Sequence, residues 1–202
     1  MVDSEPLWFR VERDFARSRG GDWTEALAHA CTGTGIGHTL RTMQQALGFA
    51  VDPVRDAEAI VATFIERVAE LSLKAGCDEL LAEARARAVP CAVASSSARP
   101  LVEATLGRFG LLDRFGAIVT GSCVERPKPA PDIFVEAARR LRAAPGECVV
   151  LEDSLAGVSA ARAAGMRAIA VPERAPARFA GLADAVVADL HEARALLRLA
   201  AA

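Results

Sequence analysis

Three short apolar runs in the chain end in polar residues whose types suit phosphate or metal chemistry. The first group is Ser95, Ser96 and Ser97, which follow the apolar run at residues 89–94. Their hydroxyl groups, together with the free N–H groups at the start of a following helix, would bind a phosphate group. The same serines would also serve as N-caps of that helix, because serine is a preferred cap residue. Taken alone, this segment favours the cap interpretation.

Lys128 is the second candidate, and it lies between two prolines, Pro127 and Pro129. Prolines limit the backbone on both sides, so the ammonium group would project from a stiff loop. A cation fixed in this way suits the neutralisation of a phosphoryl oxygen. A solvated lysine in a proline-rich loop explains the segment equally well. Lys74 and Lys128 are the only lysines among 24 basic residues, which draws attention to both.

Two adjacent carboxylates, Glu152 and Asp153, follow the apolar run at residues 148–151. Such a pair suits Mg²⁺, a hard cation that binds one or two carboxylates and keeps water and phosphate oxygens as further ligands. The alternative is that the acids only interact with the dipole at a helix N-terminus, which contributes about 0.3–1 kcal/mol. The order of the three polar groups and their shared position after apolar runs favour a phosphate site.

The spacing of apolar residues divides the chain near residue 77. Before this point they recur at helical intervals, which predicts an all-helical insert over residues 1–76. After it, strands at residues 89–94, 117–120, 148–151, 168–171 and 185–187 alternate with helices at residues 78–88, 99–109, 132–141, 154–164 and 190–199. This alternation predicts an α/β core domain over residues 77–202, with a doubly wound parallel sheet. Ligands bind such sheets at the carboxyl ends of the strands, where the three polar groups lie.

Composition excludes several functions. The chain of 202 residues is 52% hydrophobic and 25% charged, which is typical of a globular protein, and its formal net charge of −2 gives no reason to expect nucleic acid as a partner. No apolar run approaches the roughly 20 residues of a membrane helix, and the N-terminus lacks the pattern of a secretion signal. The five cysteines are scattered, which excludes a zinc cluster or a disulfide scaffold. We expect a cytoplasmic monomer or weak homodimer.

Three segments in combination resemble the haloacid dehalogenase (HAD) superfamily of phosphohydrolases: Ala-Val-Ala-Ser-Ser-Ser at residues 92–97, Glu-Arg-Pro-Lys-Pro-Ala-Pro-Asp-Ile-Phe at residues 125–134, and the segment at residues 149–166. The sequence is most similar to the β-phosphoglucomutase-like and sugar-phosphatase subgroup, which carries a helical cap. The resemblance implies that Ser95 and the Ser96 backbone bind the transferred phosphoryl group and that Lys128 neutralises it. It also implies that Asp153, helped by Glu152, holds Mg²⁺.

The sequence departs from the family pattern at its start. The family has a nucleophilic aspartate at the end of a central first strand and a second aspartate, two residues later, as general acid and base. Both precede the segment that residues 3–6, Asp-Ser-Glu-Pro, match. We therefore expect the chain as written to lack the central strand and to be inactive. A natural product with roughly 10–15 further residues would restore both aspartates. The alternative is a truncated form that binds phosphate or a protein without catalysis.

The same resemblance implies that the helical insert closes over the site and selects the substrate. His38 and Arg41 are its candidate polar groups, although the residue type of His38 slightly favours an exposed loop residue. We expect an Mg²⁺-dependent phosphatase that acts on a small phosphorylated metabolite through an aspartyl-phosphate intermediate. A sugar phosphate is the first expected substrate and phosphoglycolate the second. The alternative is a phosphotransferase of the β-phosphoglucomutase type, although no basic pair in the insert demands a bisphosphate.

Overall fold

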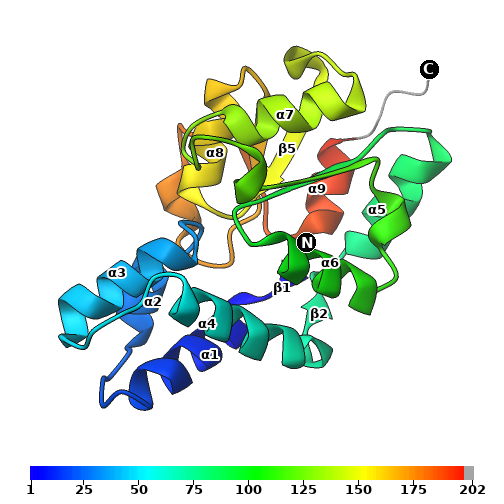
Figure 1. Ribbon diagram of the computed structural model, residues 1–202. Helices are drawn as coiled ribbons and strands as arrows, with labels where there is room; N and C mark the ends of the chain where they lie inside the picture. Colours follow the sequence, from blue (N-terminus) through cyan, green and yellow to red (C-terminus); the bar gives the residue numbers. More distant parts are fainter. Residues whose placement is uncertain (198–202) are drawn as a thin grey trace.

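The structure is a computed structural model that describes residues 1–197 (Figure 1). Its first part holds helices α1 (Glu5–Arg17), α2 (Glu25–Ala30), α3 (Ile36–Leu47) and α4 (Arg55–Glu66). The second part alternates α5 (Cys77–Ala86), β3 (Ala92–Ser95), α6 (Arg99–Arg108), β4 (Ala117–Thr120), α7 (Asp132–Leu141), β5 (Val149–Glu152), α8 (Leu155–Ala163), β6 (Arg167–Ala170), β7 (Ala185–Val186) and α9 (Leu190–Leu196). Short 3-10 helices span Val68–Glu70, Leu112–Arg114, Gly121–Cys123, Pro145–Glu147 and Pro176–Phe179. The last helix is shorter than predicted, and residues 198 and 199 of that prediction lie outside the described residues.

Local sequence explains where the helices of the first part begin and end. Helix α1 starts with an acidic residue and a proline, Glu5 and Pro6, which both suit a first helical turn. Helix α3 ends at Gly48, whose φ of 77° is left-handed and favours glycine. The apolar faces of α1, α3 and α4 enclose one buried cluster, to which Leu101 of α6 also contributes. No helix among residues 1–197 is long and apolar enough to cross a membrane.

The prediction that the first part is all-helical is wrong in one detail. Strand β1 (Val2–Asp3) pairs antiparallel with β2 (Ser72–Leu73), so the two segments that connect the helices to the second part form a short ribbon. Strands of two residues are too short to show an alternating pattern, and they exist because segments distant in sequence meet. The pattern also did not predict α2, a helix of only six residues with none buried.

The second part forms one sheet layer between two layers of helices, although its strands pair in two groups. Strand β3 pairs in parallel with β4, and β5, β6 and β7 pair in parallel in that order. Ala94 of β3 and Val150 of β5 pack in the same apolar cluster as helices α7 and α8. The alternate residues, Val93 and Leu151, pack in a second cluster with α5, α6 and α9. Figure 1 shows these two sets of helices on opposite sides. The predicted doubly wound α/β fold is therefore confirmed.

The layer is interrupted between β3 and β5. No strand among residues 1–197 pairs with the second edge of β3 or of β5, and Val149 of β5 is 39% exposed. Lys128 joins the two groups, because its Nζ atom donates to Ala94 O of β3 and pairs with Glu152 of β5. At this interruption, the facing edges of β3 and β5 have no strand partner among residues 1–197.

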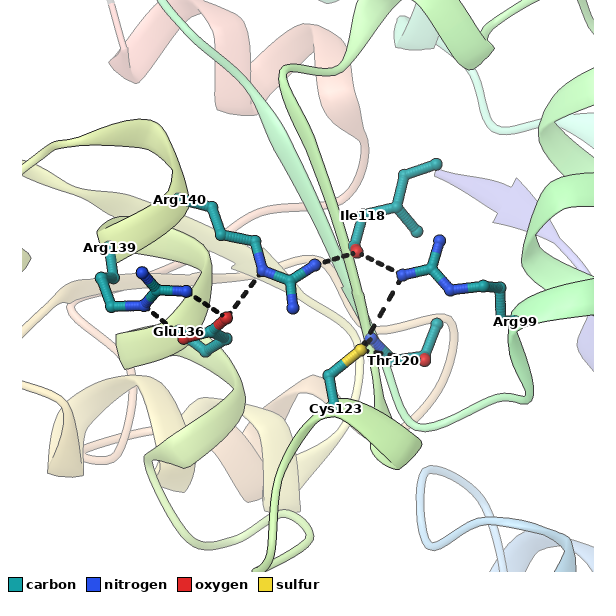
Figure 2. A network of polar contacts seen from close by, with 7 residues as sticks. All are labelled: Arg99, Ile118, Thr120, Cys123, Glu136, Arg139 and Arg140. Carbon is teal, nitrogen blue, oxygen red and sulfur yellow. Dashed lines mark hydrogen bonds and ion pairs between the residues drawn. The ribbon is translucent and has the colours of Figure 1, made fainter.

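The outer edge of the layer, at strand β4, differs from the edges at the interruption because side chains cover it. Ile118 O in the outer strand β4 accepts hydrogen bonds from Arg99 Nη2 at 3.0 Å and from Arg140 Nη1 at 3.1 Å (Figure 2). The Sγ atom of Cys123 accepts one from Thr120 N at 3.5 Å just beyond the strand. Exposed strand edges tend to pair with other chains unless charged side chains or bends block them. The outer edge carries such a block.

Candidate active site

A cavity of about 360 Å³ lies between the two parts of the molecule. One side, here called the core wall, includes Lys74, Ser95, Ser96, Lys128, Glu152 and Asp153. The other side, here called the cap wall, includes Trp8, Phe9, Glu12, Cys31, Ile36 and Thr39. The three polar groups singled out in the sequence thus meet in the core wall, at the carboxyl ends of β3 and β5.

The serines lie at the end of β3, before helix α6. Ser95 Oγ accepts a hydrogen bond from Ser97 N at 3.1 Å, which closes a tight turn. Helix α6 begins after Ala98, and no side chain caps its N-terminus. The interpretation of the serines as helix caps is therefore wrong. All three serines line the cavity next to the start of α6, and free N–H groups at a helix N-terminus favour an anion.

Lys128 is held in place by three different contacts. Its side chain is 6% exposed and forms an ion pair with Glu152. Nζ also donates to Ala94 O at 3.3 Å and lies 4.8 Å from the centre of the Phe134 ring. The interpretation as a solvated loop lysine is therefore wrong. A buried ammonium group fixed at the cavity surface can neutralise an anionic oxygen placed beside it.

Glu152 uses both carboxylate oxygens within the core wall. Oε1 pairs with Lys128, while Oε2 accepts from Asp153 N at 3.2 Å, Ser154 N at 3.2 Å and Ser154 Oγ at 3.0 Å. Helix α8 approaches this carboxylate closely at Gly157, where an added Cβ atom would overlap it. These contacts fix the orientation of the Glu152 carboxylate, and this orientation allows it to pair with Lys128.

One carboxylate oxygen of Asp153 contacts a lysine, and the other accepts no hydrogen bond from residues 1–197. Its Oδ2 atom accepts from Lys74 Nζ at 3.3 Å, and Lys74 also pairs with Glu173 at 2.7 Å. Burial lowers the pKa of Lys74, but the two carboxylates outweigh it and leave the pKa above its ordinary value. We did not predict Lys74 as a site residue, although the rarity of lysine in this sequence was a signal.

Glu152 and Asp153 differ in how well they could bind a metal ion, because they differ in exposure and in hydrogen bonding. No group of three histidine, cysteine or acidic side chains suited to a metal occurs among residues 1–197. Asp153 is 43% exposed, and its Oδ1 atom accepts no hydrogen bond from the described residues. It therefore fits Mg²⁺ bound through one carboxylate, with water and phosphate oxygens as the other ligands. Glu152 has no free oxygen in this arrangement.

The predicted substrate residues of the cap, His38 and Arg41, lie away from the cavity. Both are exposed on α3. The same helix instead turns Thr39 toward the cavity, together with Ile36. The sequence did not distinguish these faces, because glycines precede the helix and obscure its start.

Gly33 brings the cap close to the core wall. Its φ of 80° is left-handed, and an added Cβ atom would lie 2.7 Å from the Cβ atom of Ser154. A glycine therefore permits this approach, and both Gly33 and Ser154 line the cavity.

Glu12 is a second residue that sequence reasoning missed. It is 7% exposed on α1, and its Oε2 atom accepts a hydrogen bond from Trp23 Nε1 at 3.0 Å. Burial raises the pKa of Glu12 to about 7. An acid within the apolar face formed by Leu7 and Val11 was the available signal, because unpaired acids rarely lie on buried helix faces.

Comparison with known proteins defines the class. The sequence pattern of the family described as haloacid dehalogenase-like hydrolase matches residues 3–165, and the chain belongs to this family. Hexitol phosphatase B of Escherichia coli (strain K12) is 30% identical over 189 residues, which cover 85% of this chain and 79% of that protein. The crystal structure of CbbY from Rhodobacter sphaeroides in complex with phosphate has a TM-score of 0.83 and 29% identity, and covers 95% of this chain and 91% of that one.

Other relatives are much longer than this chain. SUPPRESSOR OF QUENCHING 1, a chloroplastic protein of Arabidopsis thaliana, is 52% identical over 97 residues. These residues are 48% of this chain but only 9% of that protein. The family resemblance stated from the sequence is confirmed. The activity and the substrate are argued below from the residues of the site.

Proposed function

We propose that this protein is a phosphohydrolase that acts on a small phosphorylated metabolite, with a sugar phosphate as the first substrate class. The observation that carries the proposal is Lys128, which is nearly buried where the ends of β3 and β5 meet, beside Ser95 and Asp153 in one cavity. The similarity to Hexitol phosphatase B supports the substrate class.

Each core-wall residue has a role in this proposal. The Ser95 hydroxyl and the Ser96 N–H donate hydrogen bonds to the transferred phosphoryl group, and Lys128 neutralises one of its oxygens. Glu152 is a positioning residue, because it holds Lys128 and the loop that follows β5. Asp153 would hold Mg²⁺, which when bound supplies positive charge to the phosphoryl oxygens.

In this proposal, the nucleophile lies at the interruption of the sheet between β3 and β5. The carboxylates of the core wall are Glu152 and Asp153, and both are engaged by lysines. We infer that the nucleophilic aspartate would lie on a strand between β3 and β5. The two facing edges without a partner support this placement, since the outer edge at β4 is blocked by arginines.

Such a strand completes a two-step reaction. Its carboxylate attacks phosphorus, the bond from phosphorus to the substrate oxygen breaks, and a second aspartic acid protonates the leaving alcohol. Water then cleaves the acyl phosphate and releases inorganic phosphate. Without the strand, the core wall supports only binding of a phosphate group, which is the second candidate function for the chain as written.

We assign residues 1–76 as the cap that covers the cavity and residues 77–202 as the core domain. The ribbon formed by β1 and β2 connects the two, and the contact of Gly33 with Ser154 supports closure at this position. The five cysteines are free thiols, which fits the predicted cytoplasmic location.

The proposal is tested by introducing Lys128→Ala into the protein in the form that its native source produces. Phosphate release from sugar phosphates should fall by about 100-fold or more, because a fixed charge at the phosphoryl group is lost. Arg126→Ala is the matched control, since Arg126 lies in the same loop, is 69% exposed and should leave the rate unchanged. Near-full activity of the Lys128 variant overturns the assignment.

The proposed strand between β3 and β5 is tested by the intact mass of the unsubstituted protein, purified from its native source. A mass above 21.2 kDa, with a peptide of the pattern Asp-x-Asp ahead of Val2, supports the phosphatase. A mass that matches 202 residues overturns it and favours the form that binds without catalysis.

A further inference from the structure

The cap wall contains a buried carboxyl group that the proposed reaction does not use. Glu12 projects from α1 and is 7% exposed. Trp23 Nε1 donates to its Oε2 atom at 3.0 Å and so fixes the orientation of the carboxyl group. The Oε1 atom accepts no hydrogen bond from residues 1–197, and Glu12 lines the cavity. One oriented acceptor therefore remains without a donor at the surface of the cap wall.

The neighbours of Glu12 exclude most of the water around its carboxyl group, which is open only toward the cavity. Cys31 and Thr39, which also line the cavity from the cap, are 5% and 3% exposed. A buried carboxylate without a full set of donors loses the hydration it had in water. A ligand that brings a donor to Oε1 would recover part of this loss.

Charge in the cavity is distributed unevenly between the two walls. The lysines that line it, Lys74 and Lys128, belong to the core wall. His29 lines the rim and faces Arg174, whose Nη1 atom is 2.9 Å from the histidine Nε2. Within the described cap wall, Glu12 thus has no lysine or arginine beside it. A second anionic group of a ligand would meet a buried acid without a countercharge, which is unfavourable.

We propose that Glu12 determines specificity for uncharged polyol or sugar monophosphates, by accepting a hydrogen bond from a substrate hydroxyl group at Oε1. The proposal rests on the function proposed above, because it requires the phosphate group to lie at Lys128. In this proposal, the cap wall disfavours ligands that carry a second anionic group. Such a group is the carboxylate of phosphoglycolate or the second phosphate of a bisphosphate.

The test measures binding by calorimetry at about pH 8, above the pKa of Glu12 of about 7, so that Oε1 is an acceptor. Mg²⁺ is present, and the probes are inorganic phosphate, sorbitol phosphate and phosphoglycolate. In Glu12→Gln the amide oxygen still accepts from Trp23, so the amide N–H₂ faces the cavity and replaces an acceptor with a donor. Sorbitol phosphate should bind about 10-fold more weakly, phosphoglycolate more tightly, and inorganic phosphate within about twofold of the parent. Glu58→Gln, which removes the same charge from an exposed position on α4, should change none of the three affinities.

The probes separate the two proposals. If inorganic phosphate does not bind the parent protein, the proposed function fails. If inorganic phosphate binds but Glu12→Gln leaves the ratio of sorbitol phosphate to phosphoglycolate unchanged, the role of Glu12 is overturned. Should Glu12→Gln not fold, Glu12→Asp decides, because the shorter acid keeps the charge but withdraws its oxygen from the cavity. An unchanged affinity for sorbitol phosphate in that variant also overturns the role.

Discussion

The core wall and the cap wall of the cavity handle charge in different ways. In the core wall, acids and lysines occur together: Lys128 pairs with Glu152, and Lys74 lies between Asp153 and Glu173. In the cap wall, Glu12 is buried and accepts a hydrogen bond from the Trp23 N–H group. Burial of a charge is expensive unless an opposite charge and hydrogen bonds compensate it. The two acids of the core wall therefore each have a lysine beside them, whereas burial of Glu12 in the cap wall raises the pKa of this residue to about 7.

This difference separates the parts of one substrate. A phosphoryl group carries a fixed negative charge and needs cations that are already in place. The remainder of a sugar or polyol has no charge and needs acceptors and donors for hydroxyl groups. In the proposed function, Lys128 meets the first need and Glu12 the second. The two walls are thus specialised before any ligand binds.

Removal of Glu152 is the strongest way to break the core wall. Glu152→Ala leaves Lys128 buried without a carboxylate, which should lower the free energy of unfolding by about 3–5 kcal/mol. Urea denaturation at neutral pH measures the loss. Glu136→Ala removes a carboxylate that pairs at the surface with Arg139 and Arg140, and it should cost less because solvent can reach the remaining arginines. Equal losses in the two variants would contradict the buried pair.

The cap wall is examined by the pH dependence of stability. The pKa of Glu12 is raised from 4.5 to about 7, so the folded state binds a proton more tightly than the unfolded state. Its contribution to stability is full below about pH 4.5 and is lost as the pH rises through about 7. The whole shift corresponds to about 3 kcal/mol. Glu12→Gln should lack this part of the pH dependence.

The measurement compares unfolding of the parent and of Glu12→Gln at about pH 5 and about pH 8. The parent should lose more stability than the variant over this interval. Parallel curves for the two proteins would show that Glu12 does not titrate in the folded state as its burial requires.

Gly157 tests how tightly the core wall is packed. A Cβ atom at this position would overlap the Glu152 carboxylate, so Gly157→Ala should cost about 1–3 kcal/mol and weaken the binding of inorganic phosphate. Gly146→Ala is a matched control, because no atom lies within 4 Å of the Cβ position there. Thermal unfolding and phosphate titration of both variants give the answer. Unchanged phosphate binding in Gly157→Ala would mean that Glu152 moves without consequence.

Asp153 gives the smallest expected effect. Asp153→Asn should weaken Mg²⁺ binding by about 10-fold, or about 1.4 kcal/mol, because one charged ligand becomes neutral. Calorimetric titration with Mg²⁺ measures this change, and a chelator should abolish the signal in the parent. Asp78→Asn, at an exposed position on α5, should leave Mg²⁺ binding unchanged. An unaltered affinity in Asp153→Asn would remove this residue from the metal site.

Much of the core could be predicted because its signals are local. The alternation of strands and helices gave the α/β layers, and the predicted helix at residues 132–141 agrees with α7. Ser95, Lys128 and Asp153 were found because each follows a short strand or lies in a proline-rich loop, and parallel strands bring such positions to one edge. The cap was harder, since its predicted contacts at His38 and Arg41 depended on which face of α3 turns inward.

The sequence by itself determined the order of the elements, the family and the polar groups at the strand ends, because apolar periodicity and short motifs act over a few residues. Only the tertiary structure decided that Glu152 pairs with Lys128, that Lys74 reaches Asp153 and that Glu12 lies beside Trp23 at the cavity. Two of these contacts join residues 24 and 79 positions apart, and no local pattern encodes them. Charge compensation in a buried site depends on which distant segments pack together, and packing is a property of the whole fold.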